Sequence, residues 1–482
     1  MPEIPEQQSG VGERRRSRKL ESTDTIAALS TPPGVGALAV LRLSGPGALP
    51  VLRSVCPKLQ DRTEPRRSIL TQAVDPASGE LLDRVLVTVY PGPASYTGED
   101  MVEVSCHGGW ISPALILDAC LRSGARQAEE GEFTRRAYLN GKMDLLQVEA
   151  VLDLIEGRSR ALHGAAIHQV ERGLSQRIAE LREGLVHLEA LLVHHLDFPE
   201  EDDPPVPIPQ ILEDVERLEG MMETLLRTAP EGELLREGAV VVLAGQPNTG
   251  KSSLFNALVG EERAIVTEDP GTTRDALETV VSLGGFPFRL VDTAGIRDVT
   301  ERVERLGIEV AWRYVRRADV LLFCVEGPRP LGPEERWFLE EVRGIPVVLV
   351  RTKADLSYSL AEAPPTSGDG GVAPEVAGEV EISVVSGRGL SELRALLPSL
   401  VFRGLVQQAA EVPVLTRRRQ GEGVRRALAE LRDFRRGLEE GIPAEIAATH
   451  LRPAETALEE LLGVIPREEI LDRLFREFCI GK

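Results

Sequence analysis

The chain has 482 residues, 42% of them apolar and 27% charged, and its formal net charge is −20. A length of this order predicts about two to four domains, each with an ordinary composition for burying a core. The acidic balance disfavours general nucleic-acid binding, so any such contact must use a local basic cluster such as Arg417–Arg419. No apolar run reaches the ~18 residues of a membrane span, and the five cysteines lack zinc-ligand spacing, which favours free thiols in a reducing cytoplasm.

The first part of the chain predicts a short tail followed by an α+β domain. Residues 1–22 contain "RRRSRK" and several glutamates without an apolar core, which excludes a signal peptide and predicts a disordered tail. Within residues 23–142, "GALAVLRLSG", "RVLVTVY" and "MVEVSC" predict strands, and "SPALILDACLRSG" predicts a helix closed by a glycine.

The rest of the chain predicts a helical domain interrupted by an α/β domain. Long helical periodicity begins at Asp144, and apolar strands alternate with helices from Gly238 to about Ser399, the pattern of a parallel sheet. Long helices return from about Val412. We therefore predict an all-α domain formed by residues 143–235 and 400–482, whose halves meet in space, with the α/β domain of residues 236–399 inserted between them.

The strongest chemical motif is "VVVLAGQPNTGKSSLFNAL". A strand runs into Gly245-x-x-x-x-Gly250-Lys251-Ser252 and then into a helix, which is the context that a P-loop requires. The backbone N–H groups of such a loop surround phosphate oxygens at a helix N-terminus. We expect Lys251 to reach the β- and γ-phosphates and Ser252 to bind Mg²⁺.

Two further strand ends indicate which nucleotide is bound. "FRLVDTAG" places Asp292 near the Mg²⁺ shell and Gly295 where its N–H can meet the γ-phosphate. "VLVRTKAD" ends a strand with Thr352, Lys353 and Asp355. A carboxylate there accepts hydrogen bonds from guanine N1 and the 2-amino group, which adenine cannot match, so the motifs predict a GTPase.

The chain ends in "FCIGK", and a terminal Cys-a-a-X sequence can be a prenylation signal. Gly481 and Lys482 are atypical of that signal. Apolar residues follow Pro466 at a spacing that predicts a docked helix with one buried face, namely Ile470, Leu471, Leu474, Phe475 and Phe478. Such a helix would hold Cys479 and Lys482 in fixed positions.

The motifs "GQPNTGKSS", "GTTRD", "DTAG", "TKAD" and "SVVSGRG" resemble those of the translation-factor-related GTPases. Together with "DTIAALSTPPGVGALAVLRLSG", "SYTGEDMVEVSCHGG", "GEFTRRAYLNGKMDL" and the terminal "FCIGK", they make the chain from about Asp24 to Lys482 similar to the MnmE (TrmE) family of tRNA-modification GTPases. The resemblance implies an N-terminal domain that dimerises and binds a tetrahydrofolate, a discontinuous helical domain, and an inserted Ras-like P-loop G domain.

The family resemblance also implies an activity and its partners. It implies a homodimer that hydrolyses GTP and, in a heterotetramer with an FAD-dependent MnmG-like subunit, adds an aminomethyl or carboxymethylaminomethyl group to C5 of the tRNA wobble uridine. The implied one-carbon donor is 5-formyl- or 5,10-methylene-tetrahydrofolate. The folate pocket corresponds to Arg42, Glu103, Lys142 and Lys482, with Cys479 beside it as a participant in the chemistry.

For GTP hydrolysis the resemblance implies Mg²⁺ and K⁺ as cofactors. Ile296 follows the DTAG glycine where many GTPases have a water-orienting glutamine, so another group must orient the water. The resemblance implies Glu304 for that role, and the P-loop motif predicts Lys251 as the phosphate-binding cation. Mg²⁺ is assigned to Ser252 and Thr273, and K⁺ to Asn248, Thr267, Asp269 and Thr272. The expected GTP-binding residues are Asn248, Thr249, Gly250, Lys251, Ser252, Ser253, Thr267, Glu268, Asp269, Pro270, Gly271, Thr272, Thr273, Asp292, Thr293, Ala294, Gly295, Thr352, Lys353, Asp355, Ser383, Val384 and Val385.

One departure and two alternatives remain at this point. Thr352 stands where the guanine motif usually has asparagine. Its hydroxyl can still donate and accept hydrogen bonds, but the amide that ties this loop to the P-loop and the base is lost, so we expect weaker GTP affinity with guanine preference kept through Asp355. A ribosome-assembly regulatory GTPase shares the G motifs, but no GxxG loop typical of its RNA-binding domain follows Ser399. A membrane-tethered signalling GTPase would use Cys479.

Overall fold

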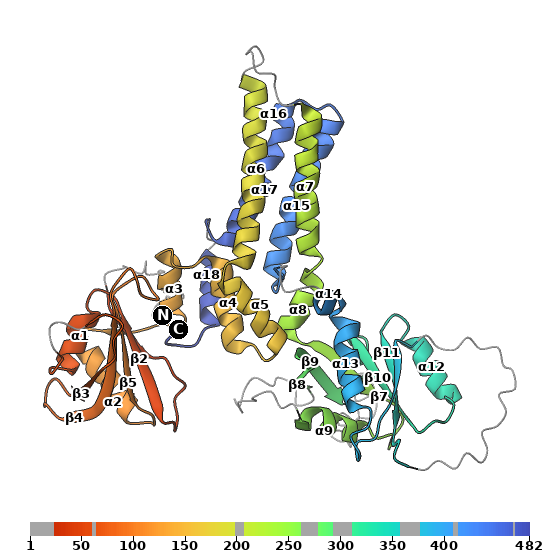
Figure 1. The fold of residues 1–482 in the computed structure, drawn as a ribbon, viewed down its shortest axis with the longest axis horizontal. Coiled ribbons are helices and arrows are strands. Elements are labelled where there is room, and N and C mark those ends of the chain that lie inside the picture. Colours follow the sequence, from red (N-terminus) through yellow and green to blue (C-terminus); the bar gives the residue numbers. More distant parts are fainter. Residues whose placement is uncertain are drawn as a thin grey trace, which may run out of the picture. The chain divides into compact units, whose positions relative to one another are not determined.

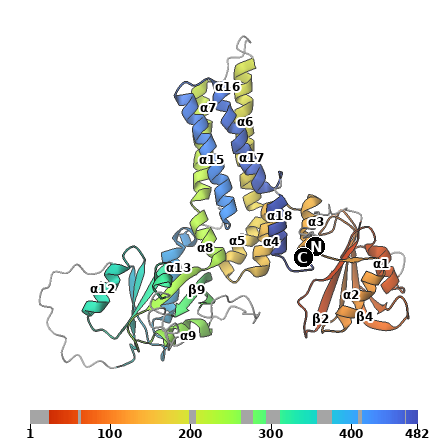
Figure 2. The same cartoon turned by 180° about the vertical axis from the view of Figure 1, so that it is seen from behind.

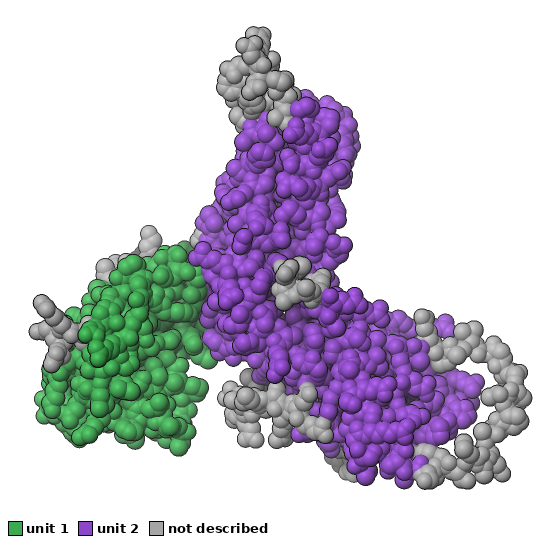
Figure 3. Space-filling view, in the orientation of Figure 1, with its two compact units in different colours: residues 1–143, 468–482 green, residues 144–467 purple. Residues whose placement is uncertain are grey.

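The computed structural model describes residues 24–59, 64–197, 207–261, 278–292, 311–356, 376–407, 413–465 and 468–482. The predicted tail of residues 1–22 lies outside these ranges. Two compact units divide the chain: residues 1–143 with 468–482, and residues 144–467 (Figure 3). Among the described residues, no helix is both long enough and apolar enough to cross a membrane.

The first unit is built on a six-stranded sheet in the order β3-β4-β5-β2-β1-β6. Neighbouring strands are antiparallel except for the parallel pair β1–β6. Alternate residues such as Leu41, Val87 and Val104 form a core, because successive strand side chains point to opposite faces. The elements are β1 (Ile26–Leu29), β2 (Leu38–Ser44), α1 (Ala48–Val55), β3 (Ile69–Val74), β4 (Leu81–Tyr90), β5 (Met101–His107), α2 (Ser112–Arg122), β6 (Arg126–Gln127) and α3 (Glu132–Leu139).

The C-terminal helix α18 (Glu468–Arg476) packs in this first unit, against α3. Its buried face consists of Leu471, Leu474 and Phe475, and the Arg135 guanidinium lies 5.9 Å from the centre of the Phe475 ring. Beyond the helix, Ile480 pairs with Glu130 in an isolated antiparallel bridge. The prediction of a docked helix that holds the terminal residues is therefore confirmed.

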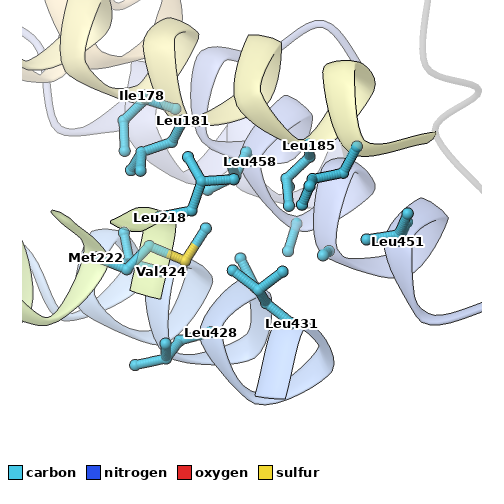
Figure 4. Packing of buried hydrophobic residues seen from close by; sticks show 14 of the residues in the cluster. Ile178, Leu181, Leu185, Leu218, Met222, Val424, Leu428, Leu431, Leu451 and Leu458 are labelled. Atoms are coloured by element: carbon cyan, nitrogen blue, oxygen red, sulfur yellow. The ribbon is translucent and has the colours of Figure 1, made fainter. Parts of the chain in front are cut away.

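The second unit contains a helical bundle whose core is drawn from both sides of the α/β segment. Helices α6, α7, α15 and α17 lie side by side (Figures 1 and 2). Leu181 and Leu218 from the first half pack with Leu431 and Leu458 from the second half (Figure 4). The helices of this part are α4 (Leu145–Glu156), α5 (Arg160–Val170), α6 (Gly173–Asp197), α7 (Ile208–Leu226), α8 (Ala229–Glu237), α15 (Arg418–Glu439), α16 (Ala444–Ala447), η1 (Ala448–His450) and α17 (Leu451–Leu462).

The α/β segment of the second unit is a six-stranded sheet in the order β12-β11-β10-β7-β9-β8, parallel except for β8 against β9. Val241 and Leu243 face one apolar cluster and Val240 and Val242 another, so both faces of the sheet are covered, as in doubly wound folds. This confirms the predicted fold class. The elements are β7 (Ala239–Ala244), α9 (Lys251–Glu261), β8 (Glu278–Leu283), β9 (Phe286–Asp292), β10 (Val320–Glu326), α12 (Pro333–Glu341), β11 (Val347–Thr352), β12 (Gly378–Glu381), α13 (Leu390–Val401) and α14 (Arg403–Gln407).

Candidate functional site

The phosphate loop connects the buried strand β7 to the N-terminus of α9. Gly245, Asn248 and Gly250 have φ angles of 141°, 63° and 86°, values that suit glycine and, in the left-handed region, asparagine. A Cβ atom at Gly245 would lie 2.4 Å from the carbonyl oxygen of Cys324, so only glycine fits against β10. These constraints produce the tight turn whose backbone N–H groups can surround phosphate oxygens.

Lys251 and Ser252 extend this loop toward the end of β9. The Lys251 amine donates hydrogen bonds to the carbonyl oxygens of Gly245 (3.1 Å) and Gln246 (2.7 Å), so the side chain lies along the loop. The Ser252 hydroxyl donates to the Asp292 carboxylate at 2.8 Å. Hydroxyl and carboxylate oxygens are the ligands that Mg²⁺ prefers, so this pair fits the metal that the sequence predicts.

Thr352 connects the predicted guanine loop to the phosphate loop. Its side chain is 3% exposed, and its hydroxyl lies 2.6 Å from the Thr249 carbonyl oxygen and 3.3 Å from that of Val325. The hydroxyl hydrogen is best placed to bond to Thr249, because that distance is the shorter one. The asparagine amide is absent, as expected, but the threonine hydroxyl forms its own hydrogen bond to the P-loop. The expected weaker GTP affinity stays a prediction.

The end of β11 and the loop after β12 form the rest of the base-recognition region. Lys353 has a φ of 58°, and its amine forms a 2.7 Å ion pair with Glu326. The Ala354 N–H donates to the Ile382 carbonyl at 3.1 Å, which brings the TKAD loop against the segment beginning at Ser383. Asp355 is exposed, so its carboxylate is accessible to a base. Val384 and Val385 are exposed in the same region.

Several predicted site residues cannot be placed in this geometry. The structure groups the phosphate loop, Asp292, the TKAD loop and the Ser383 segment at the carboxyl ends of parallel strands. The remaining residues lie outside the described ranges: Thr267, Glu268, Asp269, Pro270, Gly271, Thr272, Thr273, Thr293, Ala294, Gly295 and Glu304. Their assignments stay predictions.

A second candidate site lies in the first unit, on the sheet face opposite the apolar core that contains Leu41 and Val104. Arg42 and Glu103 are direct partners in the β2–β5 register, and the Arg42 Nε donates to the Glu103 carboxylate at 2.9 Å. The Tyr90 hydroxyl donates to the other Glu103 oxygen at 3.3 Å. The Arg42 guanidinium also lies 5.7 Å from the centre of the Tyr96 ring.

Tyr90 and Tyr96 are not among the site residues that the sequence motifs predict. A usable signal was present for Tyr90, because it ends a strand in which alternate residues face the core. The predicted alternation therefore places Tyr90 at a definite face, but its pairing partner depends on the strand order, which the sequence does not specify.

The C-terminal residues are bound to this unit through their backbone. The Phe133 N–H donates to the Lys482 carbonyl at 3.1 Å, and the Ser30 hydroxyl donates to the Gly481 carbonyl at 3.0 Å. Gly481 has a φ of 97°, and a Cβ atom there would lie 2.3 Å from the Leu29 carbonyl oxygen. Only glycine therefore allows the tail to approach β1 so closely.

This anchoring places Lys482 within electrostatic range of Arg42 and Glu103. Burial and the charge of Arg42 lower the pKa of Lys482 below its usual 10.5, while Cys479 and Glu103 act in the opposite direction. Cys479 is exposed beside the lysine. The fourth predicted folate residue, Lys142, is also exposed, and its amine donates to the Pro93 carbonyl at 3.0 Å. The groups fit an anionic, hydrogen-bonding ligand.

A third polar cluster, formed by Glu430, Asp433 and His450, has its ligand atoms within 4.8 Å of one another. Its groups already satisfy one another and a nearby cation. The His450 ring nitrogen lies 2.7 Å from the Glu430 carboxylate, and Asp433 pairs with Arg436. We interpret this cluster as an ion-pair network of the helical bundle.

The phosphate loop, the carboxylate at the end of β9 and the TKAD loop at the end of β11 together define a P-loop GTPase. The MnmE helical domain family matches residues 145–479, and the family described as GTP-binding protein TrmE N-terminus matches residues 25–142. The chain therefore belongs to the MnmE family, which replaces the ribosome-assembly alternative.

Relatives named tRNA modification GTPase MnmE align with this chain over almost their whole length. The tRNA modification GTPase MnmE of Moorella thermoacetica is 41% identical over 468 residues, which cover 95% of this chain and 99% of that protein. The protein of the same name from Heliobacterium modesticaldum is 39% identical over 467 residues, with the same coverage. Among solved structures, the G domain of the T. maritima FeoB iron transporter is 25% identical, covering 34% of this chain and 98% of its own, but with a TM-score of 0.23 it adds nothing to the assignment.

Proposed function

We propose that this member of the MnmE family is a potassium-dependent GTPase that modifies tRNA together with an FAD-dependent MnmG-like subunit. The product is a wobble uridine with an aminomethyl or carboxymethylaminomethyl group at C5, and the one-carbon unit comes from 5-formyl- or 5,10-methylene-tetrahydrofolate. The observation that carries this proposal is the joint presence of a GTPase phosphate loop and a C-terminal lysine held near Arg42 and Glu103. The names of the relatives support the tRNA substrate.

The chemistry of the first unit supports a reduced folate as its ligand. A folate carries carboxylates in its glutamate tail and N–H donors on its pterin ring. Arg42 and Lys482 supply cations, and Glu103, oriented by Arg42 and Tyr90, supplies an acceptor. Lys142 completes the proposed set. Cys479 is exposed and three residues from Lys482, which supports a part for its thiol in the modification chemistry.

The chemistry of the phosphate loop supports the proposed cations. We assign Mg²⁺ to Ser252 and Thr273, with Asp292 next to it, and K⁺ to Asn248 with Thr267, Asp269 and Thr272. A monovalent cation held by these residues would supply positive charge where negative charge develops during hydrolysis. Within the chain, Lys251 binds the phosphates and Glu304 orients water. Asn248 is exposed at the loop, where its side chain is accessible to a bound ion.

The proposed division of labour follows the predicted domains. Residues 23–142 bind folate and form a homodimer, residues 236–399 bind GTP, and residues 143–235 with 400–482 form the helical part. Of this helical part, residues 468–482 pack in the first unit and provide the terminal Cys-Ile-Gly-Lys. The reaction takes place in the cytoplasm, where tRNA and reduced folates are present together.

The test is GTP hydrolysis in potassium and in sodium at equal ionic strength, for the wild-type chain and for Asn248→Ala. We expect at least about tenfold stimulation by potassium, and loss of that stimulation in the variant, because the ion neutralises transition-state charge. Asn256→Ala is the matched control, since Asn256 is an exposed residue of α9 outside the loop. Equal wild-type rates in both salts would refute the potassium mechanism.

A further inference from the structure

Two stretches of chain connect the inserted α/β segment to the helical part of its unit. The incoming segment is residues 228–238, and the outgoing segment is described at residues 403–407 and 413–417. We call the place where these two segments contact each other the joint. A single residue separates helix α8 from β7, and β7 runs to the phosphate loop. The outgoing segment leads into α15. The Glu231 carboxylate of α8 accepts hydrogen bonds from the Gly404 and Leu405 N–H groups at 2.8 and 2.7 Å. The Leu415 N–H donates to the Thr228 hydroxyl at 3.1 Å. The incoming and outgoing segments are therefore bonded directly to each other.

At the joint, the backbones of the incoming and outgoing segments lie very close to each other. A Cβ atom at Gly232 would lie 2.1 Å from the Leu415 carbonyl oxygen, so α8 and the outgoing segment touch without an intervening side chain. Such an approach leaves little room for small adjustments, because packed interiors change between discrete arrangements more readily than they deform continuously.

The α4 residue Asp153 binds both segments of the joint. Its carboxylate accepts from the Arg417 guanidinium at 2.6 Å and from the Thr416 hydroxyl at 3.3 Å, both on the outgoing segment. Arg236, at the end of α8, lies 3.5 Å from the same carboxylate. Asp153 is 2% exposed, and burial raises its pKa while Arg417 and Arg236 oppose that rise.

A second carboxylate, one turn earlier on α4, reinforces this arrangement. Glu149 is 3% exposed and accepts from Arg419 at 2.9 Å and from the Gln420 amide at 2.8 Å, both in the first turn of α15. A buried carboxylate that loses its partners leaves an uncompensated charge in the interior. The network therefore favours two states, complete or opened, over intermediate ones.

Helix α5 connects this joint to the nucleotide site. Near its start, the Ala161 N–H donates to the Gly285 carbonyl at 2.9 Å, in the turn that precedes β9. Near its end, the Gln169 amide donates to the Val414 carbonyl at 2.7 Å, in the outgoing segment. Strand β9 in turn ends at Asp292, which accepts from Ser252 of the phosphate loop. A continuous series of contacts thus runs from the phosphate loop through β9 and α5 to the joint.

We propose that Asp153 is a positioning residue through which the nucleotide state of the phosphate loop is transmitted to the helical bundle. Asp153 holds the incoming and outgoing segments together in one arrangement. Nucleotide binding either stabilises this arrangement or opens it. The inference requires nucleotide binding by this chain but neither potassium nor folate, so it stands or falls separately from the proposed function.

The experiment is hydrogen–deuterium exchange of the full chain, without nucleotide and with Mg²⁺ and GTPγS. In the wild type, GTPγS is expected to change exchange in residues 149–156 and 413–420. In Asp153→Asn, which keeps the shape but removes the charge, the change over 413–420 is expected to fall at least about fivefold, while the GTPγS Kd stays within about twofold. A merely structural role would raise exchange equally with and without GTPγS and leave the difference unchanged.

Arg418→Gln is the matched control, because Arg418 is 82% exposed and pairs with Glu422 outside the joint, so it should behave as the wild type. If Asp153→Asn does not fold, Arg236→Gln is the alternative test variant, since that side chain is 34% exposed. Its removal should also reduce the GTPγS-dependent change in exchange over residues 413–420. A full-sized change in the variant that folds, a parallel loss of GTPγS affinity, or no change in the wild type would each overturn the proposal.

Discussion

At the scale of single residues, Thr352 shows how a departure from a motif can keep the motif's structural role. Its buried hydroxyl lies 2.6 Å from the Thr249 carbonyl and so joins the guanine loop to the phosphate loop. Asp355, the residue predicted to recognise guanine, is exposed, and Thr352 ties the loop that carries it to the phosphate loop. The residue type differs from the usual one, but the connection is present.

This arrangement predicts the effects of two substitutions at Thr352. Thr352→Val is nearly isosteric but removes the hydroxyl, so GDP affinity should fall about tenfold, equivalent to ~1.4 kcal/mol. Thr352→Ser keeps the hydroxyl and should bind within about twofold of the wild type. Isothermal titration calorimetry with GDP and Mg²⁺ measures both. Wild-type affinity in the valine variant would show that the hydroxyl bond does not support the nucleotide site.

The lowered pKa of Lys482 predicts that folate binding depends on pH. Its pKa lies below 10.5 because of burial and the Arg42 charge, so the lysine loses its charge at a lower pH than an exposed lysine does. Affinity for an anionic folate should therefore be full near neutral pH and decline as the pH rises through that lowered pKa. The measurement is the Kd of 5-formyl-tetrahydrofolate from pH 7 to about 10.5.

Lys482→Arg is the control for this titration, because arginine keeps its charge throughout the range. The ligand's own ionisation affects both proteins equally, so the ratio of the two Kd values isolates the lysine. The Kd of the wild type should therefore rise relative to the Kd of Lys482→Arg as the pH becomes alkaline. A ratio that stays constant with pH would show that the Lys482 charge does not contribute to binding.

At the scale of elements, the helical bundle depends on residues from both sides of the inserted segment. Leu181 and Leu431 are both fully buried in the same core, although α6 precedes the α/β segment and α15 follows it (Figure 4). The amphipathic repeat of each helix predicts a buried face, but a face alone does not identify its partner. The common core explains how a domain interrupted in sequence is continuous in space.

Removing buried volume from either half should destabilise the same bundle. Leu181→Ala and Leu431→Ala are each expected to lower the free energy of unfolding by about 2–5 kcal/mol, because each leaves a cavity in one core. Val186→Ala, at a 40% exposed position of α6, is the control and should change stability by less than about 0.5 kcal/mol. Urea unfolding followed by circular dichroism measures all three. A loss in only one of the leucine variants would contradict a shared core.

At the scale of the whole molecule, local and long-range features were predictable to different degrees. The phosphate loop was predictable because its strand, glycines and helix are contiguous in sequence, and the same holds for the amphipathic helix that precedes the terminal "FCIGK". The Tyr90 and Tyr96 contacts and the Asp153 joint were not, because they join residues of different strands, loops and helices. Nothing in the local pattern around Asp153 distinguishes it from a solvated helix acid.

The residue pattern alone was enough to establish a P-loop GTPase domain inserted into a helical one, and it indicated the MnmE family. These conclusions depend on residue types at fixed short spacings, which a single strand–loop–helix unit realises wherever it is placed. The folded chain was needed to show that Thr352 preserves the loop connection, that Gly481 lets the C-terminus approach β1, and that the Asp153 carboxylate of α4 contacts both Arg236 before the inserted segment and Arg417 after it. Each of those contacts depends on which surfaces pack together, and burial of apolar faces, rather than local spacing, selects that arrangement.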